Sequence, residues 1–149
     1  MEKNEDELTF NYEFTPKFWE NCFNHACPKA NDCLRHLAGM NIPDGMTHGP
    51  AIYPDSYKNE NCVHFIQIRV INGAYGFDKM LNQLKRKDEI ELRARIQGYL
   101  GGGGTYYHYN HGRKLLTPEQ QKRIIEMYHE YEYSKECQFE GYKKIYDFN

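Results

Sequence analysis

The chain has 149 residues and a formal net charge of −2, with 13 Tyr, 8 Phe and 5 Met. This length predicts a single domain, 1–149, whose core relies on aromatic rings because aliphatic residues are few. No apolar run approaches the ~18 residues of a membrane span, and the acidic first residues are unlike a signal peptide, so we expect a cytoplasmic protein.

The first half of the chain, 10–76, is predicted to hold short elements around its cysteines. Alternating apolar residues indicate a strand, Thr-Pro and Cys-Pro pairs indicate helix starts, and a cluster of prolines and glycines indicates a loop. The predicted elements are a strand over 8–14, helices over 16–24 and 28–38, a loop over 40–61 and a strand over 63–71.

The second half, 77–149, shows helix-like spacing of apolar residues, with a break near Lys87-Asp88 and an end at Gly101 to Gly104. Asn110-His111-Gly112 lies between two stretches with strand character, 105–109 and 113–116, which predicts a β-hairpin.

The segment Thr117-Pro118-Glu119-Gln120 combines a Thr N-cap, a Pro at the first helical position and a Gln that can close a capping box. A third helix of the second half is therefore predicted to begin here. The expected fold is α+β and mainly α, with a Cys-rich N-terminal half packed on a helix-helix-β-hairpin-helix C-terminal unit.

Positive charge is concentrated between Lys79 and Arg123, where ten Lys and Arg face four acids. A solvated surface would explain this charge, and a basic face for nucleic acid or another anionic partner is the sharper interpretation. Aromatic rings of the expected hairpin would stack on bases while basic groups meet phosphates. The residues predicted for this surface are Tyr107, His108, Tyr109, Arg113, Lys114, Lys122 and Arg123.

Four cysteines, Cys22, Cys27, Cys33 and Cys62, follow the pattern C-x4-C-x5-C with a fourth after 28 residues. A chain without a signal peptide keeps its thiols reduced, which leaves metal ligation or plain buried thiols. Zinc takes four tetrahedral ligands of this kind, and the same thiolates could hold an iron-sulfur cluster. No spacing matches the C-x2-C pair of specific zinc motifs, so buried thiols without metal remain an alternative.

Enzymatic motifs are missing from the sequence. It contains no G-x-S-x-G, H-E-x-x-H or P-loop pattern, and the glycine run Gly101 to Gly104 lacks the Lys-Ser/Thr pair of a phosphate loop. Cys27 near His25 is weak evidence for a nucleophile. We therefore predict no catalytic residue and expect a protein that is not an enzyme.

Several short motifs are distributed over the chain. They are Cys22-Phe-Asn-His-Ala-Cys27, Cys33-Leu-Arg-His-Leu-Ala, Asn61-Cys62, Tyr75-Gly76-Phe77, Thr105-Tyr106-Tyr107, Gly112-Arg113 and Leu116-Thr117-Pro118-Glu119-Gln120. Together these motifs resemble an uncharacterised family of small Bacteroidales proteins of unknown function, and the resemblance extends over Phe10 to Phe148. It implies that the four cysteines share a ligand site, with His64 as the alternative to Cys62 for the fourth ligand. It also implies an anaerobic bacterial cytoplasm, in which an iron-sulfur cluster could persist.

The functional hypothesis is a small binding or regulatory module with a structural zinc site and a basic aromatic surface for nucleic acid or another anionic partner. A redox or iron-sulfur protein that uses the same four cysteines is the first alternative. The second is a protein-protein interaction domain without any cofactor.

Overall fold

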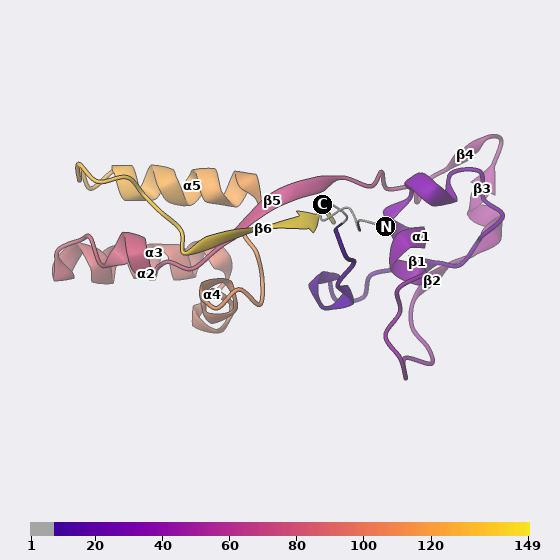
Figure 1. The fold of residues 1–149 in the computed structure, drawn as a ribbon, viewed down its shortest axis with the longest axis horizontal. Helices are drawn as coiled ribbons and strands as arrows, with labels where there is room; N and C mark the ends of the chain where they lie inside the picture. The colour runs from indigo at the N-terminus through magenta and orange to yellow at the C-terminus, as the bar shows by residue number, and fades with distance from the viewer. Residues whose placement is uncertain (1–7) are drawn as a thin grey trace, which may run out of the picture. The chain divides into compact units, whose positions relative to one another are not determined.

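A computed structural model describes residues 8–149 (Figure 1). These residues form two compact units, which are described separately. Unit 1 contains residues 8–70 and 146–149, and unit 2 contains residues 71–145. The mixed α+β class is confirmed, while the single domain stays a prediction. None of the helices in residues 8–149 has the length and apolarity that crossing a membrane requires.

Unit 1 is built from short elements joined by turns. They are η1 (Tyr12–Phe14), β1 (Asn21–Cys22), η2 (Ala30–Asp32), α1 (Leu34–Gly39), β2 (Ala51–Ile52), η3 (Pro54–Ser56), β3 (Tyr57–Lys58) and β4 (Asn61–Cys62). Strand β1 pairs in parallel with β2, and β3 pairs in antiparallel with β4. Leu34 and Ala38 of α1 are fully buried, and Ile52 of β2 is nearly so.

An aromatic cluster joins the two chain segments of unit 1. The ring of Trp19 meets Phe148 edge-on with centroids 5.0 Å apart, and Phe10 lies 5.5 Å from Tyr146 and 6.2 Å from Phe148. The backbone N–H of Asp147 donates to the carbonyl of Arg69 at 2.9 Å. The last residues of the chain therefore complete the packing of unit 1.

Four predicted elements of unit 1 are wrong. The predicted loop over 40–61 contains β2, η3 and β3 and ends at the start of β4. Residues 8–14 contain the short helix η1 instead of a strand, and residues 16–24 contain a turn and β1 instead of a helix. The predicted helix over 28–38 is split at Cys33, which is extended and forms a bridge with Gln67. This long-range pairing, together with a bond from Leu34 N–H to the Ile66 carbonyl at 2.8 Å, replaces the local helical bonds.

Unit 2 contains the longer helices. Its elements are α2 (Asp78–Leu81), α3 (Arg86–Leu100), α4 (Gly103–Asn110) and α5 (Pro118–His129), and the chain enters it within β5 (Val70–Tyr75) and leaves it within β6 (Gly141–Tyr146). Strands β5 and β6 pair with each other (Figure 1). The predicted strand over 63–71 is thus displaced, because β5 begins at Val70. The predicted helix break lies between α2 and α3, a few residues before Lys87.

One buried cluster, with residues from all four helices, from β5 and from the segment before β6, forms the core of unit 2. Phe77 stacks on Tyr106 with ring centroids 4.8 Å apart, and both rings are buried. Tyr128 of α5 is fully buried, and its hydroxyl lies 3.1 Å from each of two acceptors for its single proton, the Gln83 side-chain oxygen and the Lys135 carbonyl. This pairing of a buried ring with a satisfied hydroxyl is how tyrosine supplies core area where aliphatic residues are scarce.

The capping box at the start of α5 is confirmed. Thr117 Oγ1 accepts from the backbone N–H of Gln120 at 3.2 Å, and the Gln120 side chain accepts from the Thr117 N–H at 2.9 Å. The end of α3 is also as predicted, since Gly101 adopts a left-handed φ of 95° directly after Leu100. Both signals are local, so the sequence alone defines them.

The predicted β-hairpin over 105–116 is wrong, because α4 occupies its first half. Gly102, with φ of 123°, turns the chain into this helix, and its carbonyl accepts from the Tyr106 N–H at 2.9 Å. The side chain of Asn110 accepts from the Phe77 N–H at 2.8 Å and so serves a tertiary contact instead of a hairpin turn. Helical spacing lets both Tyr106 and Tyr109 pack on the core.

Candidate functional site

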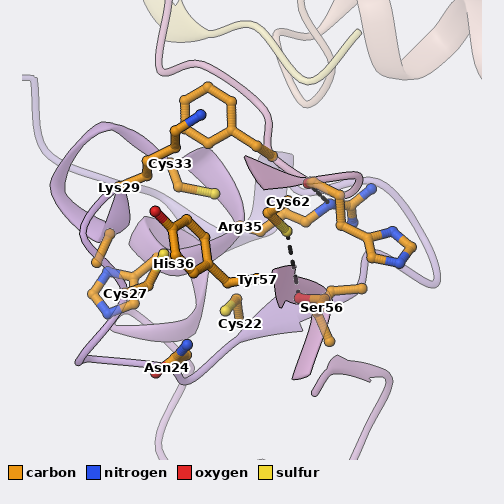
Figure 2. Close-up of a pocket in the computed structure, with 14 residues that line it drawn as sticks. Cys22, Asn24, Cys27, Lys29, Cys33, Arg35, His36, Ser56, Tyr57 and Cys62 are labelled. Atoms are coloured by element: carbon orange, nitrogen blue, oxygen red, sulfur yellow. Dashed lines mark hydrogen bonds between the residues drawn. The ribbon is translucent and has the colours of Figure 1, made fainter. Parts of the chain in front are cut away.

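Four of the five cysteines line one pocket in unit 1 (Figure 2). We call it the thiol pocket, after Cys22, Cys27, Cys33 and Cys62. Figure 2 shows their side chains around a common space that the ring of Tyr57 also enters. The cavity volume is about 20 Å³. A cavity of this size accommodates one water-sized sphere.

Backbone pairing brings the four cysteines together from different elements. Cys22 lies on β1, which pairs with β2, and Cys33 precedes α1. Gly39 of α1 packs so closely on β1 that an added Cβ would lie 2.4 Å from the Cys22 carbonyl oxygen. Cys62 lies on β4, which pairs with β3 in a hairpin. The bridge between Cys33 and Gln67 holds the segment after this hairpin against the start of α1.

The thiols differ in burial and hydrogen bonding. Cys33 is buried, whereas the other three are half-buried, and all four are free thiols. Cys62 Sγ lies 3.4 Å from the hydroxyl of Ser56, which also lines the pocket. Within residues 8–149, no three His, Cys, Asp or Glu side chains are already spaced to hold a metal ion. The pocket therefore collects potential ligands without presenting a preformed coordination shell.

Both candidates for a fourth ligand, Cys62 and His64, line the thiol pocket. The backbone around His64 is fixed by Arg35, whose Nε donates to the His64 carbonyl at 2.8 Å. The same guanidinium donates to the Glu20 carbonyl at 3.0 Å and lies 4.7 Å from the ring of Trp19. Arg35 thus orders the wall of the pocket through packing and backbone contacts.

Two histidines meet beside the thiol pocket. His25 Nδ1 and His36 Nε2 are 2.9 Å apart, and the two rings are nearly perpendicular, at 79°. Burial is the main cause that lowers the pKa of His36, and the neighbouring His25 lowers it further, against an opposing backbone hydrogen bond with Ala30. Sequence reasoning singled out His25 but had no signal that would join it to His36, 11 positions away.

The fifth cysteine, Cys137 of unit 2, has a different environment. Its Sγ lies 3.9 Å from the sulfur of Met80, and burial raises the pKa of this thiol to about 12. A thiol with this pKa stays protonated at neutral pH and is a poor ligand or nucleophile. Cys137 therefore behaves as a small apolar residue of the core.

The residues predicted for an anionic partner are dispersed by the presence of α4. Tyr107 is exposed, and it contacts His111, with ring centroids 4.1 Å apart, and the guanidinium of Arg113 at 5.7 Å. Tyr109 instead packs against the core and cannot stack on a base. His111 is a member of this exposed group that sequence reasoning missed.

The other residues predicted for the anionic partner differ in exposure and in ion pairing. His108 is half-buried, while Lys114 and Lys122 are exposed. Arg123 forms an ion pair with Glu126 at 3.6 Å, and Arg95 pairs with Glu130 at 2.7 Å. Acidic partners on the same unit thus offset part of the positive charge between Lys79 and Arg123.

Comparison with known proteins gives one finding. A family model described as "Family of unknown function (DUF6078)" matches residues 1–148. No curated protein and no solved structure matches the chain. The resemblance to a family of unknown function is therefore confirmed over nearly the whole sequence.

Proposed function

The chain belongs to this family of unknown function DUF6078, and we propose that unit 1 is a binding module stabilised by one zinc ion in the thiol pocket. The ligands would be the thiolates of Cys22, Cys27, Cys33 and Cys62. The observation that supports this proposal is that every cysteine of unit 1 lines the same pocket. Four thiolates are the complete ligand set of a closed structural zinc site.

The size of the pocket favours a single ion. Its volume of about 20 Å³ suits one small sphere. An iron-sulfur cluster, with several iron and sulfide atoms, would need the walls to move much further apart. Because the thiols are not yet at coordination distance, zinc binding would draw them inward and release their protons.

The architecture of unit 1 supplies a reason for such a site. The strands of β1, β2, β3 and β4 contain two residues each, and α1 contains six. Elements this short bury little apolar area, so a metal contributes a large share of the folding free energy in domains of this kind.

The decisive experiment is the elemental analysis of anaerobically purified full-length protein, together with Cys22→Ser and Cys33→Ser variants. We expect close to one zinc per chain, lost in both variants and retained in the control Cys137→Ser. Iron with sulfide would instead support the redox alternative. Absence of any metal would leave a protein-protein interaction domain without a cofactor.

A second function is favoured by the exposed group Tyr107, His111 and Arg113 of unit 2. A ring, an imidazole and a guanidinium in contact form a platform on which a nucleic-acid base can stack. Exposed Lys114 and Lys122 add positive charge for phosphates. We propose that this surface binds single-stranded nucleic acid.

This second proposal is tested by binding to mixed single-stranded DNA and RNA pools over a series of salt concentrations. The double substitution Arg113→Ala with Lys114→Ala should weaken binding and reduce the salt slope by about one to two. Lys58→Ala, an exposed lysine of unit 1, is the matched control and should leave the slope unchanged. Equal slopes for all three proteins would refute nucleic-acid binding at this surface.

A further inference from the structure

The two facing imidazoles of His25 and His36 are not ligands of the zinc site proposed above, although His36 lines the thiol pocket. His25 is exposed on the turn between Cys22 and Cys27, whereas His36 lies on α1. Their nearest nitrogens, Nδ1 of His25 and Nε2 of His36, are 2.9 Å apart. An exposed hydrogen bond between two imidazole rings contributes little to stability, so folding alone gives little reason for the pair.

The contact between the two rings leaves one nitrogen with a free lone pair. Nδ1 of His25 and Nε2 of His36 share one proton, so one of them donates and the other accepts. In the tautomer with the proton on His25 Nδ1, His36 Nε2 presents its lone pair, which is the form of imidazole that binds a metal.

The separation of the two nitrogens is close to that of two ligands on one ion. Two nitrogens at ~2.0 to 2.1 Å from a tetrahedral zinc lie about 3.3 Å apart. The observed 2.9 Å would therefore open slightly on binding. The Nδ1 proton of His25 would move to its own exposed Nε2, which is a change of tautomer without net loss of a proton.

We propose that His25 Nδ1 and His36 Nε2 form a second metal site, which takes a borderline divalent cation such as Zn²⁺ through two imidazoles and solvent. Imidazole is a preferred ligand of zinc, nickel and copper. Its ligands are distinct from the four thiolates, although His36 also lines the thiol pocket, and it does not require the thiolates to be loaded. Its two protein ligands and open positions make it an exchangeable site, in contrast to a closed structural one.

The test is a titration of the full-length protein with Zn²⁺ at pH 7.5, followed by long-range ¹H–¹⁵N NMR spectra of the histidine rings. After the thiol pocket is filled, further Zn²⁺ should shift the Nδ1 signal of His25 and the Nε2 signal of His36 together. The rings of His48 and His129, both exposed and apart from the pair in sequence, should not shift.

His25→Ala should abolish the shift of His36 Nε2 and the second binding event, and the exposure of His25 makes loss of folding improbable as the cause. His36→Gln should abolish the shift of His25, and His48→Ala is the matched control. Equal shifts of all exposed histidines would overturn the proposal. So would a shift of His36 with the first equivalent alone, because His36 would then belong to the thiol pocket.

Failure of the two metal proposals can be told apart. A paired histidine shift in a protein that never binds zinc through its cysteines would refute the thiol pocket as a zinc site and support the histidine pair. If zinc is lost in Cys22→Ser and no paired histidine shift is seen, the thiol pocket is supported as a zinc site and the histidine pair is refuted.

Discussion

Unit 1 and unit 2 bury apolar residues to very different extents. Unit 2 contains one cluster of 13 buried residues, among them Leu92, Ile96 and Tyr128. Unit 1 has few buried apolar residues, and most of them are small, as Ala30, Cys33 and Ala38 illustrate. The cysteines follow the same division, since the thiol of unit 2 lies in a core and the thiols of unit 1 line a pocket. One chain thus combines a unit stabilised by its hydrophobic core with a unit that we propose is stabilised by a metal.

Removal of metal should produce the largest difference in stability between the two units. Structural zinc sites contribute about 10 kcal/mol or more of binding free energy. We therefore expect a strong chelator to broaden or collapse the ¹H–¹⁵N backbone signals of unit 1 while those of unit 2 keep their dispersion. If the signals of unit 1 do not change on chelation, a metal does not stabilise unit 1.

The converse change is a cavity in the core of unit 2. Ile96 is fully buried on α3, so Ile96→Ala should reduce the free energy of unfolding of unit 2 by about 2 to 5 kcal/mol. The zinc content of the protein should not change. Measurement of urea unfolding by Tyr fluorescence, beside elemental analysis, checks both halves of this prediction, and loss of zinc in this variant would contradict it.

The close approach of α1 to β1 offers a more subtle change within unit 1. Gly39→Ala places a Cβ against the Cys22 carbonyl, a backbone atom that cannot move cheaply. We expect a destabilisation of unit 1 by about 1 to 3 kcal/mol and weaker zinc affinity in a competition titration with a chromophoric chelator. Gly49→Ala is the control, because nothing lies within 4 Å of its added Cβ. Equal affinities in the two variants would count against the role of this contact.

The smallest expected effect is a stabilisation. Asn59 and Glu60 join β3 to β4 with φ values of 51° and 63°, the left-handed region that two-residue hairpin turns require. A Glu there is strained, so Glu60→Gly should stabilise unit 1 by roughly 1 kcal/mol. A shift of the unit 1 unfolding midpoint, with unit 2 as internal reference, measures it. A lower midpoint would show that the Glu60 side chain makes a contribution that exceeds the strain.

The sequence predicts elements whose signals are local and fails where distant residues compete. The capping box at Thr117 and the left-handed end at Gly101 depend on neighbours within four positions, and both are confirmed. The helix over 28–38 fails because Cys33 pairs with Gln67, and the hairpin fails because Asn110 binds the Phe77 backbone. Neither partner is visible in a local pattern.

The candidate site follows the same rule. The cysteine pattern was sufficient to select four residues that the fold places at one pocket, because cysteine is rare and four of five cluster in the first half. The pairing of His25 with His36 depends on how the turn after β1 meets α1, which spacing alone does not define. Tyr107 and Arg113 are predicted for base stacking and phosphate contact on a hairpin, whereas α4 replaces the hairpin and leaves Tyr107 exposed beside the Arg113 guanidinium.

The route of the chain through its two units has a consequence for the order of folding. Unit 2 is an insertion, since residues 71–145 lie between the two segments that build unit 1. An unfolded insertion of this length would impose an entropic cost on closing unit 1, and prior folding of unit 2 shortens that loop. Phe148, whose ring packs on Trp19, follows the whole of unit 2 in the chain. During synthesis, unit 1 therefore begins before unit 2 and is completed after it.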